Sequence, residues 1–236
     1  MDYEIPTFEA DLKFNDLDDE ATAENTAYAV WIGGNYLGSF STDSTVKGTT
    51  LSIIVDCVWS AFDRIYQSGG RHFVSLVALP FHLAPIYTPI EEGGVGDFMI
   101  WENKTAYNVT MTKYKMKNYL TSVNTMLDYG LAVQQLIEKR WPGATFTWID
   151  MHSLVMEMIA SPAEYFEQPA NVTHAWQNCK SFGHCIDKEG LLRESFVWFD
   201  ELHPSQRVHE YPADEFIQTL EGNSNCSKTY RLVYCK

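Results

Sequence analysis

Apolar residues in this chain alternate between strand-like and helix-like patterns, which predicts a layered α/β fold. A nearly continuous apolar run covers residues 26–32 and ends at two glycines, and similar runs cover 73–79 and 145–150. Short runs of this kind are typical of parallel strands buried on both faces. Between the runs, apolar residues recur every three or four positions over 51–66 and 116–131, which predicts two helices. The alternation predicts a parallel sheet with helices on its faces and its chemistry at the carboxyl ends of the strands.

The other segments have weaker patterns. Residues 1–25 are polar and acidic and predict a short amphipathic piece followed by a loop, and the breakers in 80–98 predict a long loop. Short helices are expected near 153–160 and 212–220, among cysteine-bearing loops. The chain has no internal repeat, low-complexity tract or interdomain linker, so we expect a single domain over residues 1–236.

Composition narrows the function classes. Hydrophobic residues make up 45% of the 236 residues and aromatic residues 14%, which supports a real core rather than disorder. The net charge of −14 would repel a phosphate backbone and argues against a nucleic-acid partner. No apolar run approaches the roughly 20 residues of a membrane span.

The sequence also lacks the GxGxxG, GxxxxGK[ST], HExxH and GxSxG motifs, so we expect no cofactor and no metal.

Glycosylation sequons favour a secreted protein. They begin at Asn103, Asn108, Asn171 and Asn225, whereas the composition predicts about 1.5 such motifs by chance. The first residues, however, lack the basic and apolar regions of a signal peptide.

The five cysteines allow two interpretations. Reduced, buried thiols in a cytosolic protein are one. The sequons favour the other, in which the closely spaced Cys179 and Cys185 form a disulfide. The sequence leaves the pairing of Cys57, Cys226 and Cys235 open.

Two short motifs contain candidate catalytic groups. Asn35 follows two glycines at the carboxyl end of the first predicted strand, where its amide could stabilise an oxyanion. Asp200 precedes His203 by three residues, so the carboxylate can reach Nδ1 of the imidazole and leave Nε2 as a base. Taken singly, an ordinary turn asparagine is the simpler explanation of the first motif, and a structural hydrogen bond explains the second equally well.

The order of the motifs resembles that of the SGNH (GDSL-type) hydrolases. AVWIGGNYLG over 29–38 is similar to their third sequence block, and FDELHPS over 199–205 is similar to the fifth. Three segments between them resemble the fungal-type acetyl esterases of carbohydrate esterase family 16: VDCVW, YLTSVN and DMHSL, over 55–59, 119–124 and 150–154. The resemblance extends from about residue 24 to about residue 217.

The resemblance implies a three-layer, flavodoxin-like α/β fold and a carboxylic-ester hydrolase acting on acetylated sugars or other short-chain esters. It implies that His203 is the general base, that Asp200 orients it, and that Asn35 donates to the oxyanion. Tyr36 stands where the family block has an Asp, which affects the local turn but leaves the Asn35 amide in place.

The family nucleophile has no counterpart in this chain. It is a Ser in a Gly-Asp-Ser block on the first strand, but the 32 residues before Gly33 contain neither Gly nor Ser. Ser44 follows Thr-Asp in a polar loop and is a poor substitute. We therefore expect an esterase domain that lacks its nucleophile strand, represents the carboxyl portion of a longer protein, and is inactive alone.

Two other interpretations remain open. A secreted protein without catalytic activity could retain a carbohydrate-facing cleft. A metal-dependent enzyme could use His174, Cys179 and His184, although a disulfide at Cys179 is the simpler expectation.

Overall fold

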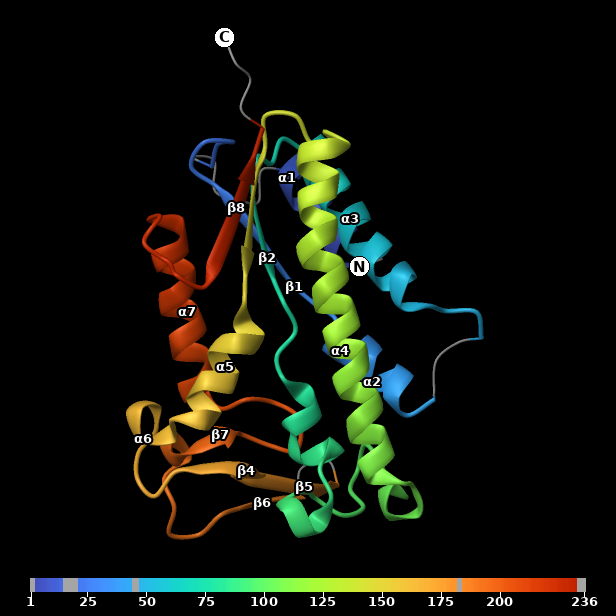
Figure 1. Cartoon of the computed structure of the whole chain (residues 1–236), viewed down its shortest axis with the longest axis vertical. Helices are drawn as coiled ribbons and strands as arrows, with labels where there is room; N and C mark the ends of the chain where they lie inside the picture. Colours follow the sequence, from blue (N-terminus) through green and yellow to red (C-terminus); the bar gives the residue numbers. More distant parts are fainter. Residues whose placement is uncertain (1–2, 15–20, 44–46, 182–183, 233–236) are drawn as a thin grey trace.

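A computed structural model describes residues 3–14, 21–43, 47–181 and 184–232 and shows a mixed α/β fold (Figure 1). The central sheet has the order β1-β2-β3-β8, in which the first three strands are parallel and β8 is antiparallel to β3. Its strands are β1 (Ala27–Trp31), β2 (His72–Leu76), β3 (Thr145–Ile149) and β8 (Ser227–Arg231). The predicted α/β class with three layers is confirmed, and the predicted parallel pairing holds for β1, β2 and β3, whereas the antiparallel strand β8 was not expected.

Helices form a layer on each side of the sheet (Figure 1). One layer contains α1 (Glu4–Phe14), α3 (Leu51–Gln67) and α4 (Val109–Ala132), and the other contains α5 (Met151–Ala160) and α7 (Gln206–Leu220). The core between the sheet and the first layer is aromatic: Phe73 stacks on Phe146 with ring centroids 4.6 Å apart, and Phe62 and Trp141 pack against them. Arg64 of α3 donates a 2.8 Å hydrogen bond to Glu9, which attaches α1 to this layer.

The predicted strands and helices are found, with corrections. After residue 160 we expected cysteine-bearing loops, but Cys179 and Cys185 lie on two paired strands, over 177–181 and 184–187. We expected the first strand to be buried on both faces, but Ala29 and Trp31 are exposed, Trp31 to 39%. The reason is position: among the described strands β1 pairs only with β2, and it therefore forms an edge of the sheet. The helix predicted over 116–131 begins earlier, at Val109, where the Asn108 side chain accepts the amide hydrogen of Met111.

Except for the segment 133–137 after α4, which lies at the other end of the sheet, the remaining elements surround the carboxyl ends of the parallel strands (Figure 1). The helix α2 (Gly34–Ser41) follows β1 directly. Two small sheets pair β4 (Asn171–Ala175) with β7 (Phe196–Trp198) and β5 (Gln177–Ser181) with β6 (His184–Asp187). The short elements are α6 (Pro162–Tyr165), η1 (Phe81–Leu83), η2 (Pro85–Tyr87), η3 (Ile90–Glu92), η4 (Lys104–Ala106), the π-helical η5 (Val133–Ile137) and η6 (Arg193–Ser195). Within the described ranges, no helix is both long enough and apolar enough to cross a membrane.

A buried lysine organises the long loop after β2. Only 1% of Lys104 is exposed, and its Nζ donates hydrogen bonds to the carbonyl oxygens of Pro85, Thr88 and Val95 at 3.1, 2.9 and 2.6 Å. Burial lowers the pKa of Lys104 to about 8. The ammonium group thus holds together three carbonyl groups that lie at separate points of the loop over residues 85–95.

Candidate active site

Asp200 and His203 form a hydrogen-bonded pair in the turn between β7 and α7. The Oδ2 and Oδ1 atoms of Asp200 lie 2.8 and 3.0 Å from Nδ1 of His203. The same Oδ1 accepts the amide hydrogens of Leu202 and His203 at 2.9 and 2.6 Å, so one carboxylate fixes both the turn and the imidazole. Nε2 of His203 has no hydrogen-bond partner among the described residues and is available to a substrate or a nucleophile.

The ionised forms of Asp200 and His203 stabilise each other. The hydrogen bond that His203 donates to Asp200 raises the pKa of His203 above its ordinary value, although partial burial opposes this effect. Burial disfavours ionisation of Asp200, but the hydrogen bonds from His203 and Leu202 outweigh it, and the pKa of Asp200 is lowered. This arrangement favours an imidazolium next to a carboxylate, the state that a general base reaches when it accepts a proton.

Asn35 lies in the first turn of α2, immediately after β1. The N-cap residue Gly33 has φ of 125° and ψ of −24°, a conformation that residues with a side chain rarely adopt. This turn leaves Asn35 exposed at the positive end of the helix. An amide donor at this position can stabilise an oxyanion, as the sequence predicts.

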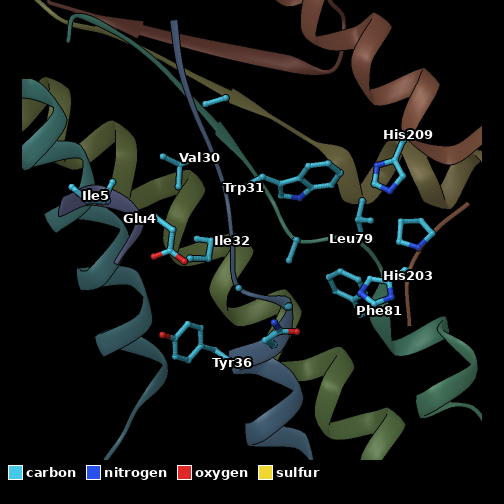
Figure 2. Close-up of a pocket in the computed structure, with 17 residues that line it drawn as sticks. Glu4, Ile5, Val30, Trp31, Ile32, Tyr36, Leu79, Phe81, His203 and His209 are labelled. Atoms are coloured by element: carbon cyan, nitrogen blue, oxygen red, sulfur yellow. The ribbon is translucent and has the colours of Figure 1, made fainter. Parts of the chain in front are cut away.

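One cleft of about 810 Å³ contains both candidate groups (Figure 2). It is lined by the end of β1, the start of α2, the segment after β2, and His203 with the beginning of α7; Asn35 is among its lining residues. In Figure 2, the Trp31 side chain points toward His209, and their ring centroids are 5.9 Å apart at an angle of 70°. Asn35 and His203 therefore lie at the same edge of the sheet, although they are far apart in the sequence.

The lining residues include no serine in the part of the chain that the structure describes. Ser44, the substitute considered from the sequence, lies outside the described residues. The cleft thus brings an imidazole and a side-chain amide together, and its described lining contains neither serine nor threonine.

The cysteine hairpin lies next to the turn that holds Asp200 and His203. The structure joins Cys179 of β5 to Cys185 of β6 in a disulfide, with Cα atoms 4.0 Å apart. Cys57 and Cys226 are free, and Cys235 lies outside the described residues. Because Cys179 is disulfide-bonded, it is not a thiolate ligand in this structure. The described residues also contain no group of three or more His, Cys, Asp or Glu side chains placed to hold a metal ion.

The structure also places the four sequons. Asn103, Asn108 and Asn225 are exposed, and Asn171 is partly buried. The Asn171 Oδ1 accepts the amide hydrogens of Thr173 and His174, so this side chain already takes part in a local turn.

Sequence reasoning missed three residues around the site. Trp31 and His209 form one wall of the cleft, and Glu201 is buried behind the dyad. Trp31 stands within the segment that resembles a family block, but a strand pattern gives no sign that the strand is an edge. His209 follows His203 by six residues, and this spacing carries no recognisable motif.

Comparisons with known proteins agree with the geometry. No model of a known protein family matches the chain. The chain is 44% identical to an acetylesterase of Hypocrea jecorina over 225 residues, which is 94% of this chain and 64% of that protein. It is 28% identical to a GDSL esterase/lipase of Arabidopsis thaliana over 121 residues, which is 49% of this chain and 34% of the relative. A second Arabidopsis thaliana GDSL esterase/lipase, EXL6, is 23% identical over 194 residues, or 79% of this chain and 49% of the relative. The chain thus spans less than two thirds of the length of each of these relatives.

Proposed function

Because the chain belongs to the SGNH (GDSL-type) hydrolases, a family of serine esterases, we propose that it forms the His–Asp and oxyanion-binding part of a carboxylic-ester hydrolase. The observation that carries this proposal is the convergence of His203 and Asn35 on one cleft. His203 accepts the proton of an attacking hydroxyl through Nε2, while Asp200 holds its Nδ1 and stabilises the imidazolium. Asn35 donates a hydrogen bond to the oxygen on which negative charge develops.

The proposal includes a nucleophile from outside this chain, because no serine is found in the described lining of the cleft. A strand that carries this nucleophile could pair with the edge of β1 that no described strand occupies. Among the described strands β1 pairs only with β2, so its other edge offers backbone donors and acceptors to an added strand. A parallel strand added there would end beside Gly33, since the carboxyl ends of parallel strands meet at one side of the sheet. A serine at that end would lie at the cleft.

We infer a small acyl ester as the substrate, with acetylated sugars as the class to test first. The supporting observation is the similarity to a protein named acetylesterase. The indole of Trp31, exposed at the cleft, is suited to pack against the apolar face of a sugar ring.

A secreted location is part of the proposal. The disulfide between Cys179 and Cys185 is of a kind that persists in oxidising compartments, and three of the four sequon asparagines are exposed. Expression through a eukaryotic secretory pathway should give glycans at Asn103, Asn108 and Asn225, detected as a mass loss on enzymatic deglycosylation. A protein that remains unglycosylated while a control glycoprotein is modified would contradict this location.

The test compares two forms of the protein. One is the 236-residue chain, and the other is the same chain extended with a Gly-Asp-Ser-bearing segment encoded at the same locus. We expect only the extended form to hydrolyse acetylated sugars and 4-nitrophenyl acetate and to react stoichiometrically with a fluorophosphonate. Labelling of the 236-residue chain itself would place a reactive serine within it and overturn the external nucleophile.

Variants of the extended form test the residue roles. His203→Ala should lower kcat by about six orders of magnitude, and Asn35→Ala by about 100-fold, as expected for a triad base and for one oxyanion donor. His184→Ala, at an exposed position on β6, is the matched control and should retain full activity. If His203→Ala retains activity, or if the extended form is inactive on every short-chain ester, the proposed function is wrong.

A further inference from the structure

Glu201 is a buried carboxylate between the two residues of the dyad. Only 4% of the residue is exposed, and burial raises the pKa of its carboxyl group. In the part of the chain that the structure describes, no Lys, Arg or His side chain forms a salt bridge with it. A buried carboxylate without a cationic partner opposes folding, so its presence at this position needs a reason.

Two hydrogen bonds hold Glu201 between separate parts of the fold. Its Oε1 accepts the amide hydrogen of Cys179 at 2.6 Å, which connects it to the disulfide hairpin. Its main-chain oxygen accepts the amide hydrogen of Ile86 at 2.7 Å, which connects it to the loop organised by Lys104. The residue therefore joins the catalytic turn to both of its neighbours.

The hairpin is attached to the residues before the turn as well. The main-chain N–H of Gln177 donates a hydrogen bond to the main-chain oxygen of Phe199 at 2.8 Å. The rings of Trp176 and Phe199 stack with centroids 5.7 Å apart. Together with the contact between Cys179 and Glu201, these interactions hold the hairpin on both sides of Asp200. A displacement of the hairpin would therefore displace the dyad.

Three titratable groups face the imidazole of His203. Asp200 raises the pKa of His203 through its hydrogen bond and its charge, and Glu201 raises it through its charge. The pKa of His209 is lowered, first by burial and then by repulsion from the His203 imidazole. A glutamine at position 201 could accept the same amide hydrogen, but only a carboxylate adds negative charge beside the imidazole.

We propose that Glu201 is a positioning residue that fixes the catalytic turn to the disulfide hairpin and stabilises the imidazolium form of His203. The catalytic meaning of this inference rests on the proposed ester-hydrolase function. The effect of Glu201 on the turn and on the protonation of His203 does not depend on that function, because both can be measured without any ester.

The experiment is an NMR titration of the His203 imidazole in the full 236-residue chain, with the resonance assigned from a His203→Gln spectrum. Glu201→Gln should lower the pKa of His203 by about half a pH unit, as expected for the loss of one nearby charge that is partly screened. The Cys179 amide should stay protected from hydrogen exchange in this variant, because the new carbonyl oxygen still accepts its hydrogen bond. Glu189→Gln removes a charge from an exposed position and should change neither quantity.

Glu201→Ala removes the acceptor together with the charge. We expect the same fall in the pKa of His203 and an exchange rate of the Cys179 amide that is higher by about tenfold. An unchanged His203 pKa in Glu201→Gln overturns the proposal, whether or not the alanine variant folds. A lowered pKa in a protein whose extended form hydrolyses no ester would support the role of Glu201 while contradicting the proposed function.

Discussion

The side chain of Asn124 forms hydrogen bonds with both backbone polar groups of Ala78. Its Oδ1 accepts the Ala78 amide hydrogen at 3.2 Å, and its Nδ2 donates to the Ala78 carbonyl at 3.1 Å. Ala78 is buried just beyond β2 and lines the cleft, at a point where the chain has left the sheet. A side chain of α4 therefore satisfies the backbone groups that a neighbouring strand would otherwise pair.

We expect Asn124→Ala to lower the free energy of unfolding by about 2–3 kcal/mol, because it leaves a buried N–H and a buried C=O unpaired. Urea denaturation followed by fluorescence measures this change. Asn118→Ala, at an exposed position of the same helix, is the control and should stay within about 0.5 kcal/mol of the wild type. Equal losses in the two variants would show that the contact with Ala78 contributes little.

Gly33→Ala should lower the free energy of unfolding by about 1–3 kcal/mol, since an alanine at φ of 125° is strained. An added Cβ would meet no atom within 4 Å, so the loss comes from the backbone and not from a clash. Gly96→Ala, whose Cβ has ordinary space at 3.6 Å, is the control for urea denaturation. Full stability of Gly33→Ala would contradict a conformational requirement at the start of α2.

The stability difference between the wild type and Asp200→Asn should depend on pH. The raised pKa of His203 contributes stability below the unfolded value of 6.5, and this contribution is lost as pH rises through the folded value. The lowered pKa of Asp200 contributes stability above 3.8, and this contribution is lost as pH falls through the folded value. The difference should therefore be largest between about pH 4 and pH 6.5 in urea titrations. A difference independent of pH, like that expected for the exposed control Asp187→Asn, would exclude the ion pair as its source.

Lys104→Met should destabilise the protein by about 3 kcal/mol or more, because three buried carbonyl oxygens lose their donor. Lys188→Met, the same change at an exposed lysine, should have little effect. Thermal unfolding of the two variants in parallel provides the measurement. A stable Lys104→Met protein would mean that the loop does not depend on the ammonium group.

The sequence predicts the parts of this fold that depend on local pattern. The apolar runs at β2 and β3 and the helical spacing in α3 are confirmed, because strand and helix periodicities are properties of short segments. The order of motifs also brought Asn35 and His203 to one edge of the sheet, a consequence of parallel topology.

What the sequence could not predict depends on contacts between distant segments. A strand pattern does not reveal that β1 lacks a second neighbour, which is why the exposure of Trp31 was missed. Charged residues are expected at the surface, yet Lys104 and Glu201 are buried because backbone groups distant in sequence satisfy them. Nothing in the local sequence of either residue indicates those partners.

The cleft combines Asn35, from the first part of the chain, with His203, which is held by Asp200, from the last part. During synthesis from the amino terminus, Asn35 leaves the ribosome long before Asp200 and His203 exist, and the half-formed cleft remains without its base until most of the chain is made. Closing it requires contacts of very high sequence separation, which form late and slowly in folding. The appearance of the His203 imidazole beside α2 is therefore a marker for completed folding of nascent chains, and ribosome-bound intermediates shorter than about 200 residues should lack it.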